Sequence, residues 1–109
     1  MSQTLPPPLA AYVEASNARD AGALTECFSA DAVVMDEGET YRGTEEIRQW
    51  ASKPQAAYDF TLETMNVATP VSETVVTFRL TGSFPGSPID LRFFFTLEGG
   101  KIVALTIRQ

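Results

Sequence analysis

The apolar residues of this chain repeat with a helical period in its first half and with a strand period in its second half. The prolines at 6–8 suit the first turn of a helix. The residues that follow them on one face, at helical spacing, are Leu9, Tyr12, Val13 and Ser16. Asp20 is a suitable N-cap for a second, shorter helix that carries Leu24, Cys27 and Phe28 on its inner side.

Two short strands are predicted next, over residues 32–36 and 39–42, with a turn at Glu37-Gly38. Thr44 is then positioned to cap a third helix, because two glutamates follow it in the first turn and complement the helix dipole. The apolar stripe of this helix is Ile47, Trp50 and Ala51. Pro54 is expected just beyond its end.

From about residue 58 onward the alternation predicts an antiparallel meander of four strands. The alternation changes phase near Glu63, which indicates a bulge, and Gly99-Gly100 predicts a tight hairpin turn before the last strand. Helices first and strands later predict an α+β fold with the helices on one face of a curved sheet. The consecutive residues Phe93, Phe94 and Phe95 point to both faces. A second subunit would cover the outer face, so we expect a homodimer.

The composition of the chain limits the classes of partner and function that we expect. The chain has 109 residues, 44% of them apolar, and a net charge of −6, which fits one soluble globular domain. The basic residues are scattered, so nucleic acid is not an expected partner. No membrane contact is expected either, since the longest apolar runs fall short of the roughly 18 residues of a membrane span. The N-terminus lacks a secretory signal pattern and Cys27 is the single cysteine, so we expect a cytoplasmic location.

The chain contains no histidine, which excludes catalytic triads built on histidine and most zinc sites. We therefore expect neither a metal nor a cofactor. Proton transfer near neutral pH would have to use carboxylates, tyrosine, lysine, the thiol or water. Asp36 stands out among these groups because it ends an apolar strand, where a carboxylate is costly unless it is paired or used. A salt bridge to Arg42 or Arg48 is the structural alternative.

Residues 28–50 read FSADAVVMDEGETYRGTEEIRQW. This segment resembles the SnoaL-like and ketosteroid isomerase-like branch of the nuclear transport factor 2-like superfamily. The matching positions are Phe28, Asp31-Ala32, Val33-Val34, Asp36, Gly43, Ile47 and Trp50. The resemblance implies a cystatin-like cone with three N-terminal helices packed on a curved antiparallel sheet. We expect residues 1–8 to be an N-terminal arm and residues 9–109 to be a single SnoaL-like domain.

The resemblance also implies roles for individual residues. Asp36 lies where the isomerases of this family place their general base, and Tyr12 lies where they place the hydrogen-bond donor to the dienolate oxygen. That chemistry requires an apolar, water-poor pocket. The pocket walls are expected from Val34, Trp50, Phe60, Val76, Phe78 and Phe93.

Asp90 is the candidate for the third member of the isomerase site, a protonated acid. However, the apolar alternation of residues 89–97 turns Asp90 toward the opposite face, as a solvent-facing charge near Arg92. Both placements remain open from the sequence.

These observations predict a cofactor-independent proton-transfer enzyme, of isomerase or cyclase type, that acts on a small apolar carbonyl compound. The alternatives are a module that binds a hydrophobic small molecule without chemistry and a dimerisation module whose cone is filled by side chains. An epoxide-opening hydrolase is a weaker alternative, because no Asp-Arg-Asp relay is evident in the sequence. A cavity that reaches Asp36 would support the proton-transfer enzyme or the binding module. A cone filled by side chains would support the dimerisation module.

Overall fold

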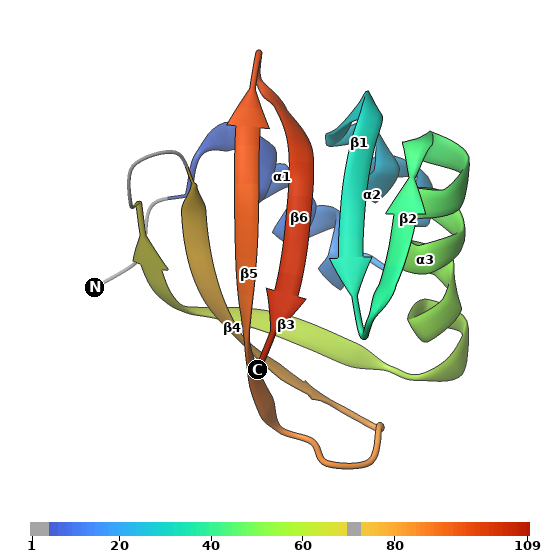
Figure 1. Ribbon diagram of the computed structural model, residues 1–109. Helices are drawn as coiled ribbons and strands as arrows, with labels where there is room; N and C mark the ends of the chain where they lie inside the picture. Colours follow the sequence, from blue (N-terminus) through green and yellow to red (C-terminus); the bar gives the residue numbers. More distant parts are fainter. Residues whose placement is uncertain (1–4, 70–72) are drawn as a thin grey trace.

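In the computed structural model, which describes residues 5–69 and 73–109, three helices cover one face of a single six-stranded sheet (Figure 1). The predicted α+β arrangement is confirmed. The elements are, in order, α1 (Pro7–Asn17), α2 (Ala21–Glu26), β1 (Phe28–Asp36), β2 (Glu39–Arg42), α3 (Gly43–Ala57), β3 (Phe60–Ala68), β4 (Thr74–Gly82), β5 (Ile89–Glu98) and β6 (Lys101–Arg108). None of the helices within this described part is long and apolar enough to cross a membrane.

The second helix starts as the sequence predicts, whereas the first starts slightly earlier than expected. α1 begins at Pro7, inside the segment expected to be an N-terminal arm, and residues 1–4 of that arm lie outside the described residues. The side chain of Asp20 accepts a hydrogen bond of 3.0 Å from the amide of Ala23, which caps α2. On α1, the side chains of Leu9 and Tyr12 are buried against the sheet.

The ends of α3 differ from the prediction. The helix starts at Gly43 with Arg42 as its N-cap, so the expected cap at Thr44 is wrong; the carboxylate of Glu46 instead accepts the Arg42 amide at 2.8 Å. Pro54 lies inside the helix rather than beyond it. A proline in the last turn disrupts one helical hydrogen bond, and its own carbonyl still accepts the amide of Tyr58 at 2.9 Å. α3 thus extends to Ala57, which places its last turn beside the sheet.

The sheet joins the hairpin and the meander into one surface, in the order β2-β1-β6-β5-β4-β3. All neighbouring strands are antiparallel except β1 and β6, which pair in parallel with Val34 opposite Leu105. This pairing extends β1 back to Phe28, four residues before the predicted start. The predicted bulge in β3 is present as a register shift between Thr64 and Asn66.

The free edge of β3 is held by α1. The side-chain amide of Asn17 donates to the carbonyl of Leu62 at 3.2 Å and accepts the Leu62 amide at 2.8 Å, as a neighbouring strand would. At the same end of the β3–β4 pair, a Cβ added to Gly82 would lie 1.9 Å from the carbonyl oxygen of Asp59. Only glycine therefore allows the chain to pass this close to the start of β3.

The outer face of the sheet carries no helix (Figure 1). Phe93 and Phe95 are buried on the inner face, whereas Phe94 is half-buried on the outer one. The guanidinium carbons of Arg92 and Arg108 lie 5.6 and 5.8 Å from the Phe94 ring centroid. The outer-face neighbours of Phe94 in the register are Val75 and Thr106.

We predict that two copies of the chain associate through this outer face, because burial of Phe94 and its neighbours removes apolar surface from water. Sedimentation at micromolar concentration should give twice the 11.9 kDa chain mass. Phe94→Glu should give the monomer, since it places a carboxylate in the contact. Gln49→Glu, which adds the same charge on the exposed side of α3, serves as the control. A parent protein that sediments as a monomer would contradict the prediction.

Candidate functional site

A cavity of about 660 Å³ lies between the helices and the inner face of the sheet. Its size is typical of small-molecule sites. The apolar part of its wall includes Leu24, Trp50, Phe60, Leu62, Leu80, Ile89, Leu91, Phe93 and Ile107. A second depression, of about 690 Å³, lies between α1, α2 and the β5–β6 turn. It is a shallow groove lined mainly by alanines and carboxylates, and it does not reach Asp36, so the first cavity is the candidate site.

Asp36 lies at the end of β1 and lines this cavity. Residues 32, 34 and 36 share one face of the strand, and Ala32 and Val34 on that face are fully buried. The indole Nε1 of Trp50 donates a hydrogen bond of 3.0 Å to Oδ2 of Asp36. Oδ1 accepts no hydrogen bond from a described residue. The indole therefore fixes the orientation of the carboxylate and leaves one oxygen free to take a proton.

Tyr12 reaches the same cavity from α1, with only 3% of its surface exposed. Its ring packs edge-on against the rings of Phe28, Phe93 and Phe95 at centroid distances of 6.1, 6.2 and 5.5 Å. Burial raises the pKa of the Tyr12 hydroxyl, and the nearby charge of Asp36 raises it further. Tyr12 is therefore a neutral hydrogen-bond donor.

The further polar residues that line the cavity include Ser16 on α1 and Gln55 on α3, besides Glu37, Tyr58, Arg108 and Gln109. The sequence analysis placed Ser16 on the inner face of its helix but assigned it no role. Its signal is the spacing of four residues from Tyr12, which puts both side chains on the same helical face. Gln55 was missed because α3 was expected to end before Pro54.

The expected wall residues divide into two groups. Trp50, Phe60 and Phe93 line the cavity. The remaining residues, Val34, Val76 and Phe78, are fully buried in the core and do not line it, contrary to the expectation. Strand alternation places them on the correct face, but neighbouring side chains cover them completely.

Asp90 lies outside the cavity, on the exposed outer face of the sheet. Its two carboxylate oxygens accept hydrogen bonds from Nε and a terminal nitrogen of Arg79 at 2.8 and 3.2 Å. Hydrogen bonding to Arg79 holds the pKa of the Asp90 carboxyl below its usual range. The role of a protonated acid in the site is thus corrected to that of a surface ion pair, and its partner is Arg79 rather than Arg92.

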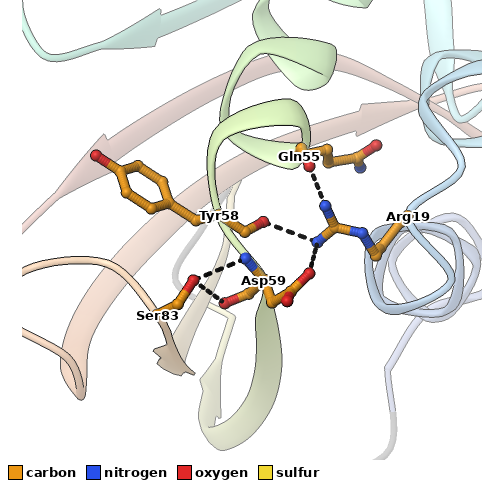
Figure 2. Close-up of polar contacts among 5 residues, drawn as sticks. All are labelled: Arg19, Gln55, Tyr58, Asp59 and Ser83. Carbon is orange, nitrogen blue, oxygen red and sulfur yellow. Dashed lines mark hydrogen bonds and ion pairs between the residues drawn. The ribbon is translucent and has the colours of Figure 1, made fainter.

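The mouth of the cavity is framed by Tyr58 and Phe84, whose rings meet edge to face at a centroid distance of 6.2 Å. Figure 2 shows how Arg19 holds this region. Its guanidinium donates to the main-chain carbonyls of Gln55 and Tyr58, the latter at 2.8 Å, and lies 3.5 Å from the carboxylate of Asp59. Arg19 therefore fixes the last turn of α3 and the start of the segment that leads into β3.

No metal-binding cluster is present within residues 5–69 and 73–109, where no three carboxylate or thiol side chains gather at one point. Besides Asp36, Glu37 is the other carboxylate that lines the cavity.

Comparison with known proteins identifies the relatives of this fold. The family model of the SnoaL-like domain matches residues 9–105. A solved structure from Sinorhizobium meliloti, described as a candidate polyketide cyclase, is 34% identical to this chain; the match covers 95% of each chain with a TM-score of 0.89. No curated protein sequence matches the chain.

Two more distant structures show the fold. A protein from Catenulispora acidiphila with a ketosteroid isomerase-like fold is 19% identical, with a TM-score of 0.85 over 97% of this chain and 87% of its own. A cystatin-fold protein from Novosphingobium aromaticivorans is also 19% identical, with a TM-score of 0.78 over 94% and 95%. The predicted cystatin-like fold and the resemblance to the SnoaL-like and ketosteroid isomerase-like family are confirmed.

We predict that Arg19→Ala lowers the free energy of unfolding by about 1–2 kcal/mol, since partly exposed hydrogen bonds to a charged group are each worth about that or less. Arg19→Lys should lose most of the same stability, because an ammonium cannot span both carbonyls. Urea unfolding measures both. Arg48→Ala, on the exposed side of α3, is the control and should change stability little. Equal stability of the Arg19→Ala and Arg48→Ala variants would contradict the stabilising role of Arg19.

We also predict a specific alkaline destabilisation that depends on Tyr12. An unfolded tyrosine ionises near pH 10, whereas the fold disfavours ionised Tyr12, so this contribution to stability is present below about pH 10 and is lost above it. The free energy of unfolding of the parent should fall more steeply above pH 10 than that of Tyr12→Phe, by up to about 1.4 kcal/mol per pH unit. Denaturation series at increasing pH measure the slopes. Parallel slopes of the parent and Tyr12→Phe would refute the prediction.

Proposed function

This chain belongs to the SnoaL-like domain family, and from that premise we propose that it transfers a proton beside the carbonyl group of a small apolar compound without a cofactor. The observation that carries the proposal is the placement of two groups in one cavity. Asp36 has an oriented carboxylate with one free oxygen, and Tyr12 is a neutral donor. These are the two groups that proton abstraction beside a carbonyl requires.

In the proposed reaction, Asp36 takes a proton from the carbon next to the carbonyl. The C–H bond breaks, an O–H bond forms on the carboxylate, and the electron pair moves to the carbonyl oxygen. The Tyr12 hydroxyl then donates a hydrogen bond to that developing negative charge, and the apolar wall excludes water. Return of the proton to another carbon completes an isomerisation. For a cyclisation, the enolate carbon instead forms a C–C bond to a second carbonyl of the same molecule, the C=O π bond breaks to give an alkoxide, and the alkoxide takes the proton back from Asp36.

The cyclase form is supported by the 34% identity to the protein described as a candidate polyketide cyclase. A binding module without chemistry is the second candidate, and the position of Asp90 favours it. Because Asp90 pairs with Arg79 on the outer face, the third group of an isomerase-type site is not supplied by that residue.

The test follows deuterium exchange at the carbon beside the carbonyl of 2-tetralone in D₂O by NMR. The parent should accelerate exchange over buffer, and Asp36→Asn should abolish the acceleration. Tyr12→Phe should slow it by about 10²–10³-fold, the usual effect of removing a donor to a developing oxyanion. Asp31→Asn is the matched control, because Asp31 is an exposed carboxylate on the same strand.

A binding measurement accompanies the exchange test. Trp50 is the only tryptophan and lines the cavity, so its fluorescence reports occupancy. 2-Naphthol mimics an enolate, and Asp36→Asn should tighten its binding because a neutral amide does not repel the phenol oxygen. Naphthol binding without exchange in the parent would leave the binding module as the function.

A further inference from the structure

Ser16 and Gln55 are polar side chains that face the cavity without a protein partner. Their surfaces are only 4% and 8% exposed. Neither side chain forms a hydrogen bond with a described residue, although other helical hydroxyls do: Thr25 and Ser52 donate to carbonyls one turn back at 2.7 and 2.8 Å. Among the described residues no fully enclosed side-chain nitrogen or oxygen lacks a partner. The polar atoms of Ser16 and Gln55 are therefore open to the cavity.

Such groups cost stability unless something else satisfies them. A buried hydroxyl or amide without a partner is penalised relative to an apolar side chain of the same shape. Leu24 and Leu62, which line the same cavity, show that apolar side chains fit this environment. Polar groups that make no hydrogen bond with the protein and open into a cavity are typical of sites that bind a ligand or water.

The two residues lie apart from the reacting pair. Ser16 is one helical turn beyond Tyr12 on α1, about 6 Å further along the axis. Gln55 lies in the last turn of α3, one turn beyond Ala51 and five residues beyond Trp50. Figure 2 shows that Arg19 binds the main-chain carbonyl of Gln55 and not its side-chain amide. Arg19 thus holds the backbone while the amide remains available.

We propose that Ser16 and Gln55 form a second polar subsite that binds a carbonyl or hydroxyl group at the opposite end of the ligand from the group held by Tyr12. The proposal rests on the proposed function, since it takes the ligand to be a planar carbonyl compound or its enolate. An amide donates and accepts, and a hydroxyl does the same, so the subsite takes either group. The substrate class is therefore a neutral compound with polar groups at both ends, such as a diketone or hydroxyketone, rather than a monofunctional ketone.

The experiment compares phenols that differ by one hydroxyl: 2-naphthol against 2,6- and 2,7-dihydroxynaphthalene, with Trp50 fluorescence as the readout. The parent should bind at least one dihydroxy compound about five- to tenfold more tightly than 2-naphthol, the usual gain from one net hydrogen bond. The double variant Ser16→Ala/Gln55→Met should lose this preference and keep its affinity for 2-naphthol. Gln49→Met is the matched control on the exposed face of the same helix and should keep the preference.

The melting temperature distinguishes a structural role of Gln55 from a role in ligand binding. If Gln55 serves the ligand, Gln55→Met should melt at or above the parent temperature, because it removes an unsatisfied polar group. A lower melting temperature together with an unchanged preference for the dihydroxy compound would overturn the proposal.

The two proposals fail in different ways. Equal affinity of the parent for all three phenols, or an equal preference in the parent and the double variant, overturns the second subsite alone. Absence of ketone exchange with the dihydroxy preference intact overturns only the proton transfer. Absence of both phenol binding and ketone exchange overturns both.

Discussion

The parallel pairing of β1 with β6 is the constraint on which the site depends. It joins an N-terminal hairpin to a C-terminal meander, and its register sets Val34 opposite Leu105. With Val34 facing inward, Asp36 also faces inward, two residues further along the strand. A slip of one residue would turn the whole apolar face outward and take the carboxylate with it. The core therefore enforces the position of Asp36, because burial of the valine and leucine side chains specifies the register.

The cavity combines two demands that oppose each other. Apolar walls keep water out and strengthen any hydrogen bond made inside, while each polar group placed among them costs stability until it finds a partner. The polar groups in the cavity are accommodated in different ways. Trp50 satisfies one oxygen of Asp36, burial keeps Tyr12 protonated, and Ser16 and Gln55 are left open. The polar atoms of Ser16 and Gln55 are not fully enclosed, so they remain accessible to water or to a ligand in the cavity.

Besides covering one face of the sheet, the end of α1 holds neighbouring elements in place. Arg19 binds the carbonyls at the end of α3 and Asn17 binds the edge of β3, so both elements that frame the mouth are tied to the end of α1. These contacts are made by side chains to main-chain atoms, which fixes the backbone whatever residues occupy the wall.

The sequence by itself determined the elements, their faces and the family. Strand alternation placed Asp36 in phase with buried residues, and helical spacing placed Tyr12 on the inner face of α1. Tertiary structure decided what periodicity cannot encode. Alternation gives the face of a residue but not its depth, so Val76 and Phe78 were expected in a wall and lie in the core. It gives no partner either: only the β4–β5 register brings Asp90 to Arg79 on the outer face. The expectation that α3 ends before Pro54 was wrong, and for that reason Gln55 was not identified as a cavity residue. The helix continues to Ala57 because its packing against the sheet outweighs the one hydrogen bond that proline removes.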